Sequence, residues 1–132
     1  MKKAEILRGG SHFKHTILQG ERIEGKLLRC HYLLSDEAGP PLRVGFAVSS
    51  RTFNAVRRNR IKRLLRDAVT TEKRVVEHAL VAAHRHASAV LLFKGGKSNR
   101  VERMKVYMLQ PEVAALFRTL ALKLQSDQEW QQ

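Results

Sequence analysis

The chain has 132 residues, 43% of them hydrophobic, and a net charge of +13 at pH 7. Such a chain fits one domain with its own core, which excludes a disordered basic tail. No apolar run approaches the roughly 20 residues that cross a bilayer, and we expect no secretory signal. The single cysteine, Cys30, excludes an internal disulfide. We expect a cytoplasmic protein with a polyanionic partner, rather than a membrane or a small-molecule substrate.

The first predicted elements are a short helix and a strand. Residues 11–19 carry apolar side chains at helical spacing, and Gly20 would end the helix. From residue 22 to residue 34 the pattern changes to period two, which predicts a strand. One face of that strand is predicted core and consists of Leu28, Cys30, Tyr32 and Leu34. The other face carries Arg29 and His31, so we expect it to be open to solvent or ligand.

A second strand and a long helix come next. Residues 42–49 alternate again, and the short loop 35–41 predicts that the two strands form an antiparallel pair. A helix is predicted over residues 54–69, with Asn54 as its N-cap. Its buried stripe repeats at i, i+3, i+4 and i+7 and consists of Ile61, Leu64, Leu65 and Ala68.

The C-terminal part predicts a further helix, a central strand and a last helix. Residues 72–83 look helical, and residues 87–93 are apolar apart from Ser88, as in a strand buried on both faces. Pro111 fits the first position of the last helix, whose apolar stripe continues to Leu124. The length and these elements predict one domain, 1–132, with both ends mobile.

The helix at 54–69 is unusually basic. Between Glu37 and Asp67 there is no acidic residue, and this window holds eight basic ones: Arg43, Arg51, Arg57, Arg58, Arg60, Lys62, Arg63 and Arg66. Like charges four residues apart, as in Arg58–Lys62, cost a few tenths of a kcal/mol each. Phosphate would compensate that cost, because each neutralised phosphate also releases condensed counterions. The pattern favours a nucleic-acid partner over a plain solvated helix.

The side chains opposite the buried stripe fit such a partner. Arg63 and Arg66 can grip phosphate oxygens with two bonds, and arginine can also stack on bases. Asn59 lies among these cations and can both donate and accept, so it could read a base edge or a ribose hydroxyl. The alternative for Asn59 is an ordinary surface amide.

No other pattern predicts a catalytic or metal site. The pairs His12 with His15 and His84 with His86 have spacings that suit a metal, but no clear third ligand lies nearby. No Ser/His/Asp triad or carboxylate pair can be argued. The basic loop 94–100 lacks the spacing of a phosphate-binding loop. This absence fits a protein whose chemistry belongs to a partner.

Three segments in this order resemble the bacterial ribonuclease P protein subunit: residues 43–49 (RVGFAVS), 54–56 (NAV) and 58–66 (RNRIKRLLR). The resemblance covers about residues 8–124. It implies an α+β fold with an N-terminal helix, a four-stranded sheet, a long basic helix in a left-handed β-α-β crossover and a C-terminal helix. The general rule favours the right hand. The turn 49–54 departs from the family pattern, with Ser50 replacing a basic residue and Phe53 a glycine.

The resemblance also implies a function. The chain would bind ribonuclease P RNA, which uses Mg²⁺ to cut the 5′ leader from precursor tRNA, and would itself bind no cofactor. The positions implied to contact this RNA are Arg51, Arg58, Asn59, Arg60, Lys62, Arg63 and Arg66. A cleft between the first helix and the sheet would hold the single-stranded leader, with Phe13, Ile17, Arg29 and His31. Base stacking there depends on the rings of Phe13 and His31, and the alternative for Phe13 is core packing.

Two other functions remain open at this point. A ribosomal or RNA-chaperone protein could carry a similar basic helix. A helix-turn-helix DNA reader is a weaker alternative, because here a strand leads directly into the basic helix.

Overall fold

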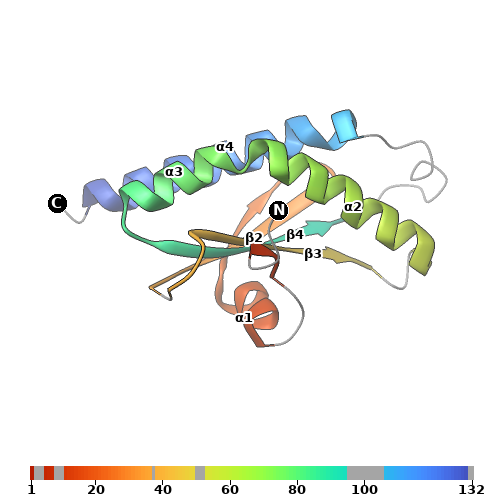
Figure 1. Ribbon diagram of the computed structural model, residues 1–132, viewed down its shortest axis with the longest axis horizontal. Coiled ribbons are helices and arrows are strands. Elements are labelled where there is room, and N and C mark those ends of the chain that lie inside the picture. Colours follow the sequence, from red (N-terminus) through yellow and green to blue (C-terminus); the bar gives the residue numbers. More distant parts are fainter. Residues whose placement is uncertain (2–4, 8–10, 37, 50–52, 95–105, 131–132) are drawn as a thin grey trace.

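The structure, a computed structural model, describes residues 1, 5–7, 11–36, 38–49, 53–94 and 106–130. Four helices and four strands follow each other along these residues, as the ribbon in Figure 1 shows. They are α1 (Ser11–Gln19), β1 (Glu21–Glu24), β2 (Leu28–Ser35), β3 (Leu42–Val48), α2 (Ala55–Glu72), α3 (Arg74–Ala82), β4 (His86–Phe93) and α4 (Val106–Trp130). The predicted α+β class is confirmed.

The strands form one mixed sheet in the order β1-β2-β4-β3. β4 pairs antiparallel with β2 and parallel with β3. The predicted antiparallel pair of strands 22–34 and 42–49 is therefore wrong, because β4 lies between β2 and β3. Alternation indicates which face of a strand is buried but not which strand lies beside it. The apolar run of β4 suits this central place, as predicted.

The predicted single strand over residues 22–34 is also wrong, because it is a hairpin. β1 and β2 are joined by a tight turn in which the Gly25 N–H donates to the Leu28 carbonyl at 2.8 Å. Glu112 of α4 holds this turn, since its Oε1 accepts from the backbone N–H groups of Leu27 and Leu28 at 2.8 and 3.0 Å. These bonds tie the hairpin to the C-terminal helix.

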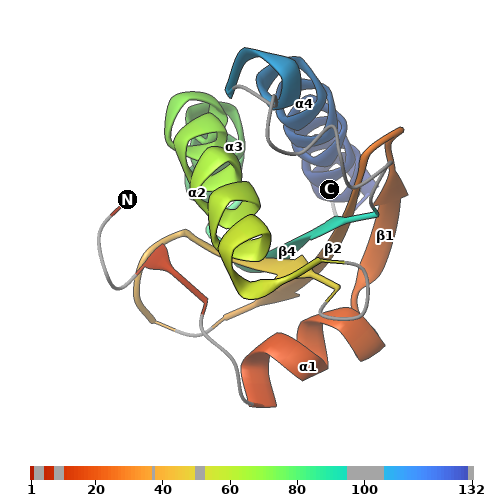
Figure 2. The ribbon, with the colours of Figure 1, turned by 90° about the vertical axis from the view of Figure 1, so that its right-hand side faces the viewer.

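The chain leaves β3, passes through α2 and α3, and returns as the parallel neighbour β4. Viewed with the helices nearest the reader and the strands pointing upward, β4 lies to the left of β3, so the crossover is left-handed (Figures 1 and 2). The hand implied by the resemblance is confirmed, against the general right-handed rule.

The core lies between the sheet and three helices. In Figure 2, α2, α3 and α4 cover one face of the sheet and α1 lies against the other. The predicted stripe of α2 and most of the predicted core face of β2 point into this layer: Leu28, Cys30, Tyr32, Ile61, Leu64, Leu65 and Ala68 are all buried. Leu34, predicted on the same face, is only half-buried at the margin of the core. Burial raises the pKa of the Cys30 thiol to about 12, so Cys30 serves as a small apolar side chain.

α4 differs from its prediction at both ends. It begins at Val106 rather than at Pro111, and it continues to Trp130 rather than ending near Leu124. Pro111 therefore lies inside the helix, where its missing N–H removes one backbone hydrogen bond. The stripe with Val113, Leu120 and Leu124 is buried against the core, and this packing outweighs the local cost of the proline.

Candidate nucleic-acid interface

The basic helix α2 is fixed at its start by a polar cap and a buried ring. Asn54 Oδ1 accepts from the backbone N–H of Arg57 at 2.9 Å, as its predicted N-cap role requires. Phe53 is buried and packs on Phe93, with ring centroids 5.8 Å apart. Arg58 Nη1 donates to the Phe53 carbonyl at 2.9 Å. The aromatic residue that replaces the family's glycine therefore anchors the turn to the core.

Lys62, Arg63 and Arg66 lie on the part of α2 that faces away from its buried stripe. Asn59, Arg63 and Arg66 are exposed, whereas Arg58, Arg60 and Lys62 are half-buried. Among the residues that the structure describes, no carboxylate forms an ion pair with Lys62, Arg63 or Arg66. We call these three residues the cationic face of α2. Arg51, which the resemblance also implied, lies outside the described residues.

A second surface lies on the other side of the sheet, beside α1. The ring of Phe13 rests over Gly45 of β3, where an added Cβ would lie 2.9 Å from Phe13 Cε2. Glycine at this position lets α1 approach the sheet closely. Gly45, Val90 and His31 form one row across β3, β4 and β2. Phe13 and Ile17 are half-buried, so α1 brings both predicted leader-cleft side chains to this face.

His31 lies on the predicted face but is not open. It shares the face of Arg29, as alternation indicated, yet only 7% of its surface is exposed. The expectation of an open strand face is therefore wrong at His31, because α1 packs on this side of the sheet. Burial, and then the charges of Arg29 and Arg22, lower the pKa of His31, while Glu24 acts in the opposite sense. The ring is therefore neutral at neutral pH.

Arg29 belongs to a cluster of charges around Glu24. The Glu24 carboxylate accepts from Arg29 Nε at 2.6 Å and from Lys94 Nζ at 3.1 Å, and Arg22 Nε lies 3.3 Å away. The hydrogen bond from Lys94, with further help from Arg29, lowers the pKa of Glu24 although burial opposes it. Glu24, Arg22 and Lys94 were not among the site residues predicted from the sequence. The first two could have been found if the hairpin had been predicted, because β1 pairs Arg22 with His31 and Glu24 with Arg29.

The described residues contain no group of three or more His, Cys, Asp or Glu side chains that could hold a metal ion. Within the same residues, no helix is both long and apolar enough to span a lipid bilayer.

Comparisons with known proteins agree on one family. The family model described as Ribonuclease P matches residues 1–120. The ribonuclease P protein component of Symbiobacterium thermophilum is 42% identical over 69 residues, which cover 52% of this chain and 59% of the relative. That of Chlorobaculum tepidum is 40% identical over 85 residues, covering 61% and 55%. The matched region thus spans less than two thirds of these relatives.

Solved structures show the same fold at low sequence identity. The RNase P protein of Thermotoga maritima superposes with a TM-score of 0.69 at 19% identity, covering 87% of this chain and 96% of that one. The RNase P protein of Staphylococcus aureus gives a TM-score of 0.67 at 18% identity, covering 89% and 96%. With the family match over most of its length, the chain belongs to the ribonuclease P protein family.

Proposed function

We propose that this chain is the protein subunit of ribonuclease P, the endoribonuclease that removes the 5′ leader from precursor tRNA. Its partners in this proposal are ribonuclease P RNA and precursor tRNA. The RNA, with Mg²⁺, supplies the chemistry, and the chain's own residues bind and position RNA. The family match and the names of the relatives support this assignment.

The observation that carries the proposal is the cationic face of α2. Lys62, Arg63 and Arg66 lie within two helical turns without a carboxylate partner among the described residues. Such unpaired charge costs stability in the free protein and is compensated when phosphates displace their counterions. We assign this face, with Arg58, Asn59 and Arg60, to the ribonuclease P RNA.

The α1 side of the sheet is assigned to the leader. Phe13 provides a half-buried ring on which a base can stack. Arg29 and Lys94 provide cations for the phosphates of a single strand, although Glu24 now holds both. Ile17 supplies apolar contact, and buried His31 forms part of the floor rather than a stacking partner.

Reconstitution tests the proposal. The full chain is mixed with a ribonuclease P RNA and precursor tRNA at a low magnesium concentration, and cleavage at the mature 5′ end is measured. We expect the protein to enhance processing at that site. A ribosomal or RNA-chaperone protein would instead bind both RNAs and leave site-specific cleavage unenhanced, and that result would reject the proposal.

A further inference from the structure

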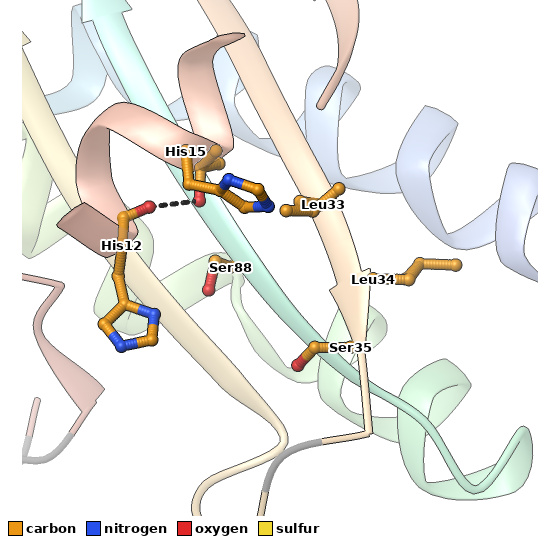
Figure 3. Close-up of a pocket in the computed structure, with 7 residues that line it drawn as sticks. His12, His15, Leu33, Leu34, Ser35 and Ser88 are labelled. Atoms are coloured by element: carbon orange, nitrogen blue, oxygen red, sulfur yellow. Dashed lines mark hydrogen bonds between the residues drawn. The ribbon is translucent and has the colours of Figure 1, made fainter. Parts of the chain in front are cut away.

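A pocket lies beside α1, at the ends of β2 and β4. It has a volume of about 230 Å³ and is lined by His12, His15, Thr16, Leu33, Ser35 and Ser88, together with Leu34. In Figure 3, the two imidazole rings project from α1 on one side, and Leu33, Ser35 and Ser88 come from the two strands on the other. The Leu34 side chain points away from this group.

The lining combines flat rings, one apolar side chain and free hydroxyl groups. His12 and His15 are exposed, so their ring faces are available for stacking. The hydroxyls of Ser35 and Ser88 make no hydrogen bond within the described residues, whereas Thr16 donates to the His12 carbonyl at 2.8 Å. Among the described residues that line the pocket, none is a carboxylate. Stacking surfaces beside donors that can also accept are what a nucleobase requires.

The volume of the pocket and the residues around it limit the kind of ligand that fits. The volume is below the roughly 300–1,000 Å³ of pockets that hold drug-sized ligands, so the pocket suits a single base or sugar. A smaller hollow adjoins it, lined by Arg43 and His86 and sharing Ser35 and Ser88 with it. Arg43, whose guanidinium donates to the Ala38 carbonyl at 3.5 Å, therefore brings a cation next to the pocket, and a cation there suits the phosphate of a nucleotide.

The pocket is separate from the predicted leader cleft. Phe13 closes the space between α1 and β3 over Gly45, and buried Thr16 fills the space beneath the middle of the helix. The pocket residues Leu33 and Ser88 pair on one side of the row Gly45, Val90 and His31, whereas Arg29 lies on the other side of that row. A strand in the cleft would not pass through this pocket.

We propose that this pocket binds one unpaired nucleotide of an RNA. The base lies against the imidazoles of His12 and His15 and against Leu33, and the hydroxyls of Ser35 and Ser88 hydrogen-bond its edge. The inference rests on the proposed function in taking RNA as the ligand. It adds a second single-stranded contact to the protein, apart from α2 and from the leader cleft.

Binding of a mononucleotide to the full chain tests the pocket directly. Adenosine 5′-monophosphate is titrated at millimolar concentrations while the imidazole resonances of the histidines are followed by NMR. Ribose 5-phosphate, which lacks the base, is titrated in parallel. We expect the nucleotide to shift His12 and His15 in a saturable manner, and ribose 5-phosphate to shift them much less.

Variants locate the site. Ser88→Ala should weaken nucleotide binding roughly three- to tenfold through one lost hydrogen bond, and His15→Ala at least about fivefold through lost stacking. His78→Ala is the matched control, because His78 is exposed on α3, and binding should not change. Ser35→Ala replaces Ser88→Ala if the latter fails to fold.

Three results would overturn the inference: unmoved His12 and His15 resonances, equal shifts with ribose 5-phosphate, or equal loss of binding in His78→Ala. None of them bears on cleavage in the reconstitution assay, so failure of this site is distinguishable from failure of the proposed function.

Discussion

The two surfaces assigned to RNA both carry arginine and lysine side chains, but they differ in whether carboxylates pair with these cations. On the cationic face of α2, Lys62, Arg63 and Arg66 have no carboxylate partner among the described residues. On the α1 side of the sheet, Arg22, Arg29 and Lys94 surround Glu24. The first surface projects its charge outward and suits a large polyanion. The second holds three cations around one carboxylate, so its charge is only partly neutralised, and its contacts with RNA depend more on short-range stacking and on exchange of ion pairs.

The largest effect is expected on the cationic face. Replacing Lys62, Arg63 and Arg66 together by alanine should weaken binding of ribonuclease P RNA by about a hundredfold near physiological salt. It should also flatten the salt dependence by about one unit per lost phosphate contact. Filter binding over a range of salt concentrations measures both. Arg118→Ala on α4 is the control with an exposed cation elsewhere. An unchanged slope in the triple variant would remove this face from the interface.

The second-largest effect is expected at Phe13, the side chain on which a base of the leader would stack. Phe13→Ala should weaken binding of leader-bearing precursor tRNA roughly 5- to 100-fold, because stacking on an aromatic ring contributes about 1–3 kcal/mol per base. Mature tRNA should bind almost as before. Leu18→Ala is the matched control, since Leu18 lies on the same helix and is 77% exposed. Equal losses for precursor and mature tRNA would mean that Phe13 is only a packing residue.

A smaller effect in the opposite direction is expected at Glu24. Glu24→Gln frees Arg29 and Lys94 from their ion pairs, so affinity for the precursor should rise severalfold and become more sensitive to salt. Because the pKa of Glu24 is lowered, the wild type should approach this behaviour only in acid. Glu77→Gln, which removes a carboxylate paired with Lys73 on α3, should leave affinity unchanged. Weaker binding by Glu24→Gln would show that the carboxylate positions these cations rather than competing for them.

The smallest effect concerns stability. The folded protein lowers the pKa of His31 below its usual value of 6.5, so the unfolded chain takes up a proton first as the pH falls. The free energy of unfolding therefore falls as the pH drops from 6.5 to the lower pKa of His31 in the folded protein. The loss is at most about 1.4 kcal/mol per pH unit. Urea unfolding near neutral and mildly acid pH should show this loss in the wild type and less of it in His31→Gln. A pH dependence unchanged by His31→Gln would contradict the assignment to His31.

Features governed by neighbours in the chain could be predicted. The Asn54 cap and the buried stripe of α2 follow from local hydrogen bonding and a period of 3.6 residues, and both are confirmed. The positive charge of α2 could also be predicted, because the sequence holds basic residues and no acidic residue between Glu37 and Asp67. Features governed by distant contacts could not be predicted in the same way. Phe53 stands in a polar stretch of sequence, and it is a core residue because it packs against residues far along the chain, among them Phe93 of β4.

Periodicity and charge along the chain predicted the basic helix, and the resemblance of three short segments implied the α+β fold and the family. Short segments of the chain carry both signals by themselves. Three features became visible only in the folded chain: β4 separates β2 from β3, α1 covers His31, and Glu24 holds Arg29 and Lys94 while the cationic face of α2 has no carboxylate partner among the described residues. Each of these depends on which segments meet across the sheet, and that choice is made by packing over the whole chain.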